Sequence, residues 1–184
     1  MTKKFVRYIL DRPVDAVPVV GLKIEEATSD DLAAVADLIA QRERNDPERH
    51  LQYLKAQIAE GPNSCQIFIA RLEAELVAYA RISWHQYPEL PVGWYLTGLV
   101  IAADQQRRGI GRAVTEHRIH WLRSRSDFDQ IDRLYYFASS RNDASRDLHA
   151  RLGFTEIERN ISVPGCTFED GIGILYSQQL NGRH

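Results

Sequence analysis

The chain has 184 residues, of which 44% are hydrophobic and 26% are charged, and its formal net charge at pH 7 is -2. This length suits one domain, or one domain with an extension, and is enough to bury a sizeable core. The near-neutral charge gives no general attraction to nucleic acid or to a membrane surface, so we expect neither as a partner.

The first 18 residues include charged side chains such as Lys3 and Lys4 and lack the uninterrupted apolar centre of a secretion signal. No apolar run along the chain reaches the length needed to span a membrane. The two cysteines, Cys65 and Cys166, do not make a disulfide framework and suit reduced thiols. These features predict a cytoplasmic protein.

Pro13 and Pro18 bracket a linker-like segment, so residues 1–18 are expected to form an N-terminal extension and residues 19–184 the domain proper. The domain is expected to begin with a strand at 19–24. The run Thr28-Ser29-Asp30-Asp31 is typical of a capping box and predicts the start of a helix, followed by a second helix at 47–60.

The periodicity then changes to that of strands. Strands are predicted at 66–72, 76–84 and 94–101, the first two joined by a short turn. Gly98 lies inside the third strand, where a glycine often marks a bulge or a close approach of another group to the backbone.

A helix is predicted to follow, with Ile110, Ala113, Val114, His117 and Trp121 on its inward face. The remaining predicted elements are a strand at 131–138, a helix that starts near residue 142, and strands at 154–163 and 172–180. In that second helix Ala144, Leu148 and Leu152 are expected to point inward, and Gly153 to act as its C-terminal cap. The order predicts an α/β (α+β) fold: a mixed, mostly antiparallel central sheet flanked by helices.

Two glycines, Gly109 and Gly111, follow the third strand and open a long helical pattern, with Arg107, Arg108 and Arg112 around them. The first N–H groups of a helix have no intrahelical partner, and the helix dipole adds partial positive charge there. Glycines also let a ligand approach the backbone closely. This pattern predicts a site for a phosphate-rich ligand.

The run Gln106-Arg107-Arg108-Gly109-Ile110-Gly111 resembles the Gln/Arg-x-x-Gly-x-Gly/Ala loop of the GCN5-related N-acetyltransferase (GNAT) superfamily. The run from Asn142 to Gly153-Phe154 resembles the second signature of that superfamily, and the order of elements over about residues 19–180 also matches. The resemblance implies a GNAT-like fold with a splayed strand pair. It also implies transfer of an acetyl group from acetyl-CoA to a primary amine by direct attack in a ternary complex.

The resemblance also implies which residues bind coenzyme A. The diphosphate would lie on backbone N–H groups from Arg107 to Arg112, and the pantetheine arm would pair with the backbone of residues 99–101. The N–H near Val100 would serve as the oxyanion donor, and Asn142 would meet the amide or thioester end of the cofactor. The complete set is Leu99, Val100, Ile101, Gln106, Arg107, Arg108, Gly109, Ile110, Gly111, Arg112, Ala113 and Asn142.

The superfamily often carries a tyrosine, as the acid for the leaving thiolate, where this chain has His149. Asn142, Ser145 and His149 are spaced to share one helical face. His149 is therefore a candidate proton donor, with Ser145 as a weaker one. A structural, hydrogen-bonded histidine is the alternative interpretation.

The general base is less well defined. Thr97 stands where some relatives carry a glutamate, and the candidates are Glu89 and His85, acting directly or through water. A role unrelated to catalysis is the alternative for both, and an amine of low pKa needs no base. Glu116, His117 and His120 do not follow the metalloprotease order His-Glu-x-x-His, so no metal is expected.

The sequence does not identify the acceptor site. Trp84, Tyr87, Trp94 and Tyr95 either line it or pack on the sheet, and packing is favoured for the two tryptophans. Glu169-Asp170 either attracts a cationic amine or forms a turn before the last strand.

Three functions are weighed. A small-molecule amine N-acetyltransferase is favoured, and a peptide or protein N-acetyltransferase and a non-catalytic acyl-CoA-binding module are the alternatives. A dinucleotide-binding fingerprint fails because Val114 stands where a third glycine or alanine is required. Assembly into a homodimer is left open.

Overall fold

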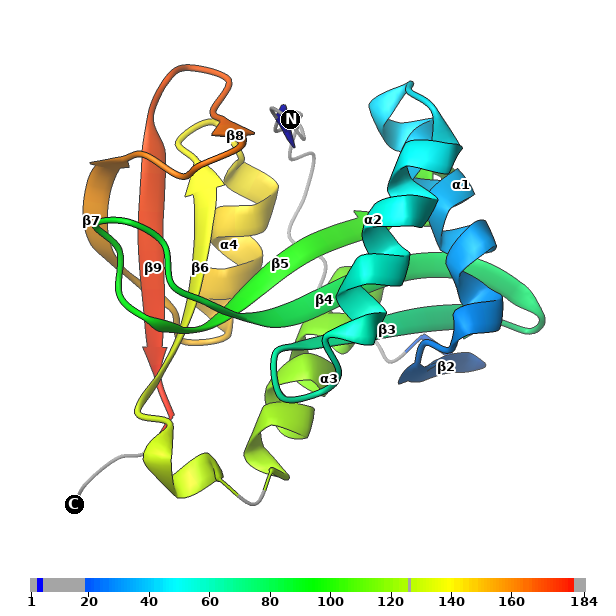
Figure 1. Ribbon diagram of the computed structural model, residues 1–184, viewed down its shortest axis with the longest axis horizontal. Helices are drawn as coiled ribbons and strands as arrows, with labels where there is room; N and C mark the ends of the chain where they lie inside the picture. The colour runs from blue at the N-terminus through cyan, green and yellow to red at the C-terminus, as the bar shows by residue number, and fades with distance from the viewer. Residues whose placement is uncertain (1–2, 5–18, 126, 181–184) are drawn as a thin grey trace. The chain divides into compact units, whose positions relative to one another are not determined.

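The computed structural model describes residues 3–4, 19–125 and 127–180 (Figure 1). Over these residues the predicted order of strands and helices is confirmed, with short elements added. The long elements are β2 (Leu22–Glu26), α1 (Leu32–Glu43), α2 (Pro47–Ala59), β3 (Cys65–Leu72), β4 (Glu75–His85), β5 (Gly93–Ile101), α3 (Ile110–Arg123), β6 (Arg133–Ser139), α4 (Asp143–Arg151), β7 (Thr155–Ile161) and β9 (Gly173–Gln179). The short elements are β1 (Lys3–Lys4), β8 (Cys166–Thr167) and the 3-10 turns η1 (Ser29–Asp31), η2 (Ala103–Gln105) and η3 (Phe128–Gln130).

The seven long strands form one sheet in the order β2-β3-β4-β5-β6-β9-β7. The β2–β3, β3–β4, β6–β9 and β7–β9 pairs are antiparallel, whereas β5 and β6 are parallel, with Trp94 opposite Leu134 and Tyr95 opposite Tyr135. The mixed, mostly antiparallel sheet predicted from the sequence is therefore confirmed. The splay of the parallel pair stays a prediction.

The predicted extension at residues 1–18 lies outside the described residues, apart from Lys3–Lys4, which pair with β8. The domain boundary at residue 19 therefore stays a prediction. The chain divides into two compact units. In the part of the chain that the structure describes, the first unit comprises residues 3–4, 85–95, 125 and 127–180, and the second comprises residues 19–84 and 96–124. Within these residues no helix has the length and apolar character needed to cross a bilayer.

In the second unit, the predicted capping box forms at the start of η1, where the Asp31 carboxylate accepts hydrogen bonds from the backbone N–H and hydroxyl of Thr28 at 2.8 and 2.9 Å. Helices α1 and α2 cover one face of β3 and β4 (Figure 1). The buried face of α1 includes Leu32, Val35, Ala36 and Ile39. Trp84, at the end of β4, is 47% exposed, so its packing role stays a prediction.

Helix α3 packs through Ile110 and Val114 against alanines of β3 and β4. Its predicted inward face is only partly right. The buried stripe runs through Thr115, Arg118, Ile119 and Leu122, whereas Ala113, His117 and Trp121 are half-buried. The stripe is rotated because the sheet offers backbone carbonyls that satisfy the Arg118 guanidinium.

In the first unit, α4 packs on β6 and β9 through a buried histidine. The His149 ring stacks on Tyr136 at 3.8 Å between centroids, and Arg146 donates to the Tyr176 hydroxyl at 3.1 Å. The buried residue of this helix is His149. The aliphatic residues predicted to point inward are only half-buried: Ala144, Leu148 and Leu152. Gly153, with φ of 85°, ends the helix as predicted.

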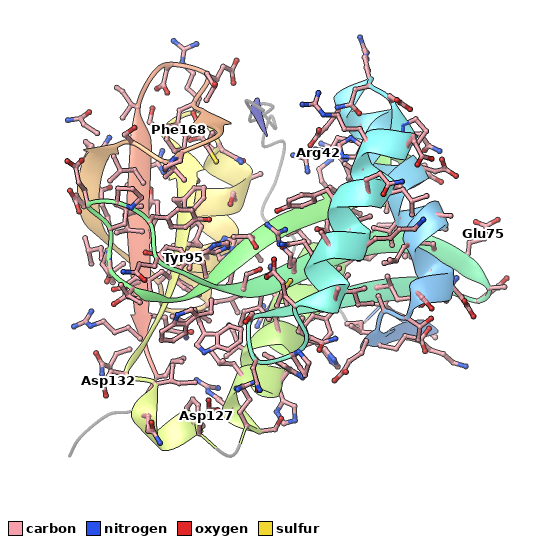
Figure 2. The ribbon with its side chains drawn as sticks, viewed as in Figure 1. Arg42, Glu75, Tyr95, Asp127, Asp132 and Phe168 are labelled. Carbon is pink, nitrogen blue, oxygen red and sulfur yellow. The ribbon has the colours of Figure 1, made fainter. Side chains whose placement is uncertain are left out.

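The opposite face of β6 and β9 carries a cluster of apolar and aromatic side chains, in which Tyr95 and Phe168 take part (Figure 2). Tyr87 packs against the cluster, and Trp94 is 2% exposed, with the Arg125 guanidinium 5.0 Å from its ring centroid. The packing role predicted for Trp94 is confirmed.

Candidate active site

The glycine-rich loop leaves the start of α3 open. Arg107 and Gly109 both adopt left-handed conformations, with φ of 60° and 86°, and Gly109 is the N-cap residue. The Ala113 N–H donates to the Gly109 carbonyl at 3.0 Å, as expected of the first intrahelical bond. The N–H groups of residues 109–112 therefore have no acceptor within the helix. No side chain caps this end, and its first turn holds no acidic residue.

The three arginines of the loop differ in their contacts. Arg112 pairs with Glu116 at 2.8 Å, and Arg108 donates to the side chain of Gln105. Arg107 is exposed, and its side chain contacts no acceptor among the residues described. The Gln106 amide donates to the Ile101 carbonyl at 3.3 Å, which ties the loop to the end of β5. The start of α3 is thus open, polar and positively charged.

Gly98 forms the predicted bulge in β5, with φ of 55°. Alternate residues of a regular strand point to the same face. Thr97 bonds to the Arg81 side chain, which contacts α2, and Val100 packs in the core under α1 and α2. Because these two residues lie three positions apart yet face the same way, one extra residue stands between them.

The close approach predicted at Gly98 is also present. A side-chain carbon at this position would lie 2.9 Å from the Tyr79 hydroxyl oxygen, so only glycine fits. Beyond the bulge, the Leu99 carbonyl accepts a hydrogen bond of 2.7 Å from Arg42, at the end of α1 (Figure 2). The strand segment assigned to the pantetheine arm is therefore held by a side chain from a neighbouring helix.

A buried guanidinium, that of Arg81, lies against the Thr97 side chain. Arg81, 3% exposed, donates from Nε to the Thr97 hydroxyl at 2.9 Å and from Nη1 to Gln57 at 2.6 Å and to the Tyr53 hydroxyl. Burial raises the pKa of neighbouring Tyr79 to about 12, so this phenol stays protonated. Thr97 accepts from a cation and thus cannot act as a proton acceptor.

The two candidate bases lie in the segment that precedes β5. Glu89 is exposed and left-handed, with φ of 63°, in a turn where the Leu90 N–H donates to the Tyr87 carbonyl at 3.4 Å. His85 stacks on Tyr87 at 4.5 Å between ring centroids and meets Tyr95 edge-on at 6.0 Å. The structure brings His85 into an aromatic cluster and leaves Glu89 at the surface.

Asn142, Ser145 and His149 share one side of α4, as their spacing predicts. The Asn142 side-chain oxygen caps the helix by accepting from the Ser145 N–H at 3.2 Å. The His149 Nδ1 lies 2.7 Å from the Ser145 carbonyl and 3.4 Å from the Ser145 hydroxyl. A carbonyl is only an acceptor, so Nδ1 carries the proton of that bond. This contact orients the ring.

His149 is only 4% exposed and lies against the aromatic rings of Tyr136 and Phe154. The same geometry serves a structural role, because a flat ring in this place fills the space between α4 and the sheet.

Asp170 belongs to a turn. Its carboxylate accepts from the Ser139 and Ser140 hydroxyls and from the Ile172 N–H at 3.1 Å. The hydrogen bond from Ser140 is the main cause that lowers the pKa of Asp170 below the usual 3.8. This carboxylate already has donors from the chain itself, which agrees with the turn interpretation of Glu169-Asp170.

In the described ranges, no three His, Cys, Asp or Glu side chains gather closely enough to hold a metal ion. His117 instead meets the Phe68 ring edge-on at 5.3 Å.

Sequence reasoning missed the buried polar residues around the bulge: Tyr79, Arg81 and Arg118. Neither Arg81 nor Arg118 has a carboxylate within 4 Å among the residues that the structure describes. A signal for Arg81 was present, since it interrupts the apolar run Val77-Ala78-Tyr79-Ala80-Arg81-Ile82. A charge in the middle of a buried strand needs a specific partner.

Comparison with known proteins identifies the class. The model of the acetyltransferase (GNAT) family matches residues 32–154. This range contains both the loop before α3 and α4. The chain therefore belongs to the GNAT acetyltransferase family, and it is an acyltransferase.

Solved structures share the fold at low sequence identity. YncA of Salmonella typhimurium, solved with its cofactor acetyl-CoA, has a TM-score of 0.68 and 18% identity, covering 89% of this chain and 96% of that one. The ribosomal-protein-S18-alanine N-acetyltransferase of Escherichia coli has a TM-score of 0.63 and 22% identity, covering 89% and 97%. The ribosomal-protein-alanine N-acetyltransferase of Brucella melitensis has a TM-score of 0.66 and 21% identity, covering 86% and 99%. A search of curated protein sequences gave no significant match.

Proposed function

We propose that this protein is an N-acetyltransferase that transfers the acetyl group of acetyl-CoA to the primary amine of a small molecule. The observation that carries the proposal is the start of α3, with its glycine N-cap and N–H groups that have no acceptor within the helix. A diphosphate needs several N–H donors and positive charge, and the helix N-terminus with its neighbouring arginines offers both. A GNAT structural neighbour contains acetyl-CoA, which agrees with this assignment.

The residues of the second unit are assigned to binding. The N–H groups from Arg107 to Arg112 hold the diphosphate, and the backbone from Leu99 to Ile101 pairs with the pantetheine arm. The Val100 N–H donates to the acetyl oxygen, where negative charge develops during attack. Acetyl-CoA supplies the acetyl group and a thiol leaving group.

The remaining residues are assigned to positioning and to proton transfer. Asn142 contacts the amide or thioester end of the cofactor. The acceptor nitrogen forms a bond to the acetyl carbon as the bond from carbon to sulfur breaks, and the amine loses one proton. Glu89 takes that proton directly or through water, with His85 as the alternative base. His149, with Ser145 beside it, returns a proton to the thiolate.

A peptide acceptor is the second candidate, because two of the structural neighbours are named as N-acetyltransferases of ribosomal-protein alanine. The near-neutral net charge of -2 offers no general attraction to a strongly charged polymer, which favours the small amine.

A single screen separates these functions. Purified protein is mixed with acetyl-CoA and a panel of small amines, amino acids and peptides that begin with alanine, and free thiol is measured while the product is identified by mass. We expect turnover on a small amine. Turnover on the peptides alone would reassign the protein as a peptide acetyltransferase. Acetyl-CoA binding without turnover on any amine would leave a non-catalytic binding module, and no binding would reject the site at α3.

A further inference from the structure

A chain of hydrogen bonds runs through the second unit from the glycine loop to the bulge of β5. The Thr115 hydroxyl donates to the Gly111 carbonyl at 2.7 Å. Arg118, one turn further along α3, donates from Nη2 to the same hydroxyl at 2.9 Å. Its Nη1 donates to the carbonyls of Thr97 at 3.3 Å and Arg81 at 2.9 Å. Thr97 directly precedes Gly98, so four residues connect the start of α3 with the bulge.

Burial makes this connection specific. Thr115 is 0% and Arg118 is 1% exposed, so water does not compete for their donors. The Arg118 side chain finds no carboxylate within 4 Å in the described part of the second unit, and its Nε is buried without an acceptor there. An apolar side chain such as methionine would fill the space without that penalty. Burying an arginine here therefore costs more free energy than packing alone requires. What the arginine adds is a set of directed hydrogen bonds that fix the position of α3 against β4 and β5.

That geometry joins the two parts of the proposed cofactor site. Gly111 lies in the turn assigned to the diphosphate, and Thr97 lies three residues before Val100, the assigned oxyanion donor. A shift of the first turn of α3 changes the hydrogen bond that Gly111 accepts from Thr115. Because Thr115 also accepts from Arg118, the shift changes the hydrogen bond from Arg118 to the Thr97 carbonyl as well. Gln106 and apolar contacts already tie the start of α3 to Leu99 and Ile101, beyond the bulge, whereas this chain of hydrogen bonds reaches Thr97, on the other side of it.

We propose that Thr115 and Arg118 are positioning residues that set the register of the β5 bulge according to whether a diphosphate occupies the start of α3. The inference rests on the proposed acetyl-CoA site. Under this proposal α3 has a second role besides binding. A diphosphate bound at its start changes the conformation of β5, the strand proposed to hold the reacting thioester.

The first test follows the backbone by NMR and uses ADP as the probe, because ADP carries a diphosphate but no pantetheine arm. In the wild-type protein, ADP is expected to shift the amide signals of Gly109 and Gly111 and also those of Thr97 and Gly98. In Thr115→Val the loop signals still shift and the bulge signals do not. In Thr115→Ser, which keeps the hydroxyl, both sets shift again.

These outcomes distinguish the proposed relay, which is the chain of hydrogen bonds from Gly111 through Thr115 and Arg118 to Thr97, from the diphosphate site on which it rests. If ADP leaves the loop signals of the wild type unchanged, the diphosphate site itself is wrong, and the relay falls with it. If the loop signals shift and the bulge signals stay, the site stands and the relay is overturned. A bulge response that persists in Thr115→Val also overturns it.

The second test is kinetic. With acetyl-CoA and an amine found in the screen, Thr115→Val is expected to lose about 10-fold in kcat while the Kd for coenzyme A changes by less than about 3-fold. With S-acetylpantetheine, which lacks the diphosphate, wild type and variant are expected to react at equal rates. Arg118→Lys, which keeps the charge and one donor, should retain more of the acetyl-CoA rate than Arg118→Met. Equal kcat in Thr115→Val and wild type, measured well below both melting temperatures, would overturn the proposal.

Discussion

Helices α3 and α4 begin in opposite ways. Helix α4 is capped by its own sequence, since the Asn142 side chain accepts from the Ser145 N–H, and an acidic residue, Asp143, stands in its first turn. Helix α3 begins at a left-handed glycine with no side-chain cap and no acid in its first turn. The same unpaired N–H groups arise in both helices. In α4 a side chain of the chain itself accepts from one of them, and in α3 the N-cap glycine offers no such side chain, which agrees with the anion site proposed there.

The comparison teaches how to separate a stabilising helix start from a binding one. A cap side chain stabilises the protein in the absence of any ligand. An open start adds little to stability, and its donors become useful only when an anion arrives. Substitutions at α3 should therefore change affinity, and substitutions at α4 should change stability or turnover.

The largest effect is expected at Gly109. In Gly109→Val, a branched side chain must enter a left-handed conformation and cover the N–H groups at the start of α3. Loss of two hydrogen bonds to a charged diphosphate, at about 2 kcal/mol each, weakens acetyl-CoA binding by about 1,000-fold. Isothermal titration calorimetry measures the change.

Gly153 provides a matched control, because its φ of 85° equals that of Gly109 within a degree and it lies at the C-terminal end of α4. Gly153→Val should lose similar stability to backbone strain and keep its affinity for acetyl-CoA. Similar losses of affinity in both variants would show that strain, rather than the blocked N–H groups, is responsible.

A smaller effect, on turnover, is expected from His149→Phe. Phenylalanine keeps the stacking on Tyr136 and removes the nitrogen that would protonate the leaving thiolate. We expect kcat to fall about 100-fold, as is typical when general acid catalysis is lost, with the Kd for acetyl-CoA unchanged. Steady-state kinetics with the amine from the screen measure it. Wild-type turnover in this variant would leave His149 with its structural role alone.

Most elements could be predicted from the sequence because apolar spacing records which face of an element is buried. The prediction of which residues are buried failed where a polar side chain occupies a buried position. On α3 the spacing pointed to Trp121, but Arg118 is buried because backbone carbonyls on β4 and β5 accept its donors. On α4 the spacing predicted that aliphatic residues are buried. His149 is buried instead, because its ring packs against the rings of Tyr136, on β6, and Phe154.

The loop before α3 could be predicted because its chemistry is local to six consecutive residues. The bulge at Gly98 could be suspected from a single glycine, yet the close contact that disfavours a side chain there comes from Tyr79, on β4. The polar network of Arg81, Thr97 and Arg118 depends on the register of two strands and on the rotation of α3. None of these can be read from one segment of the chain.

A smaller effect, on stability alone, is expected at the cap of α4. Asn142→Ala removes the acceptor of the Ser145 N–H and should lower the free energy of unfolding by about 1 kcal/mol without ligand. Asp46→Ala at the start of α2, where Asp46 accepts from the Glu48 N–H at 3.0 Å, should cost about the same. Urea denaturation measures both. If neither variant is destabilised, the contrast drawn here between capped and open helix starts is wrong.

The smallest effect is expected at Asp170, and it depends on pH. The lowered pKa of this carboxylate means that its stabilising contribution is complete above the ordinary value of 3.8 and is lost as the pH falls through the lower value of the folded state. Asp170→Asn should therefore melt about 2 °C below the wild type at pH 6, and the gap should narrow between pH 5 and pH 3. Differential scanning fluorimetry across this range measures it, with Glu169→Gln as the control, since Glu169 is exposed in the same turn. A gap that stays constant down to pH 3 would mean that the hydrogen bonds from Ser139, Ser140 and Ile172 do not depend on the charge of Asp170.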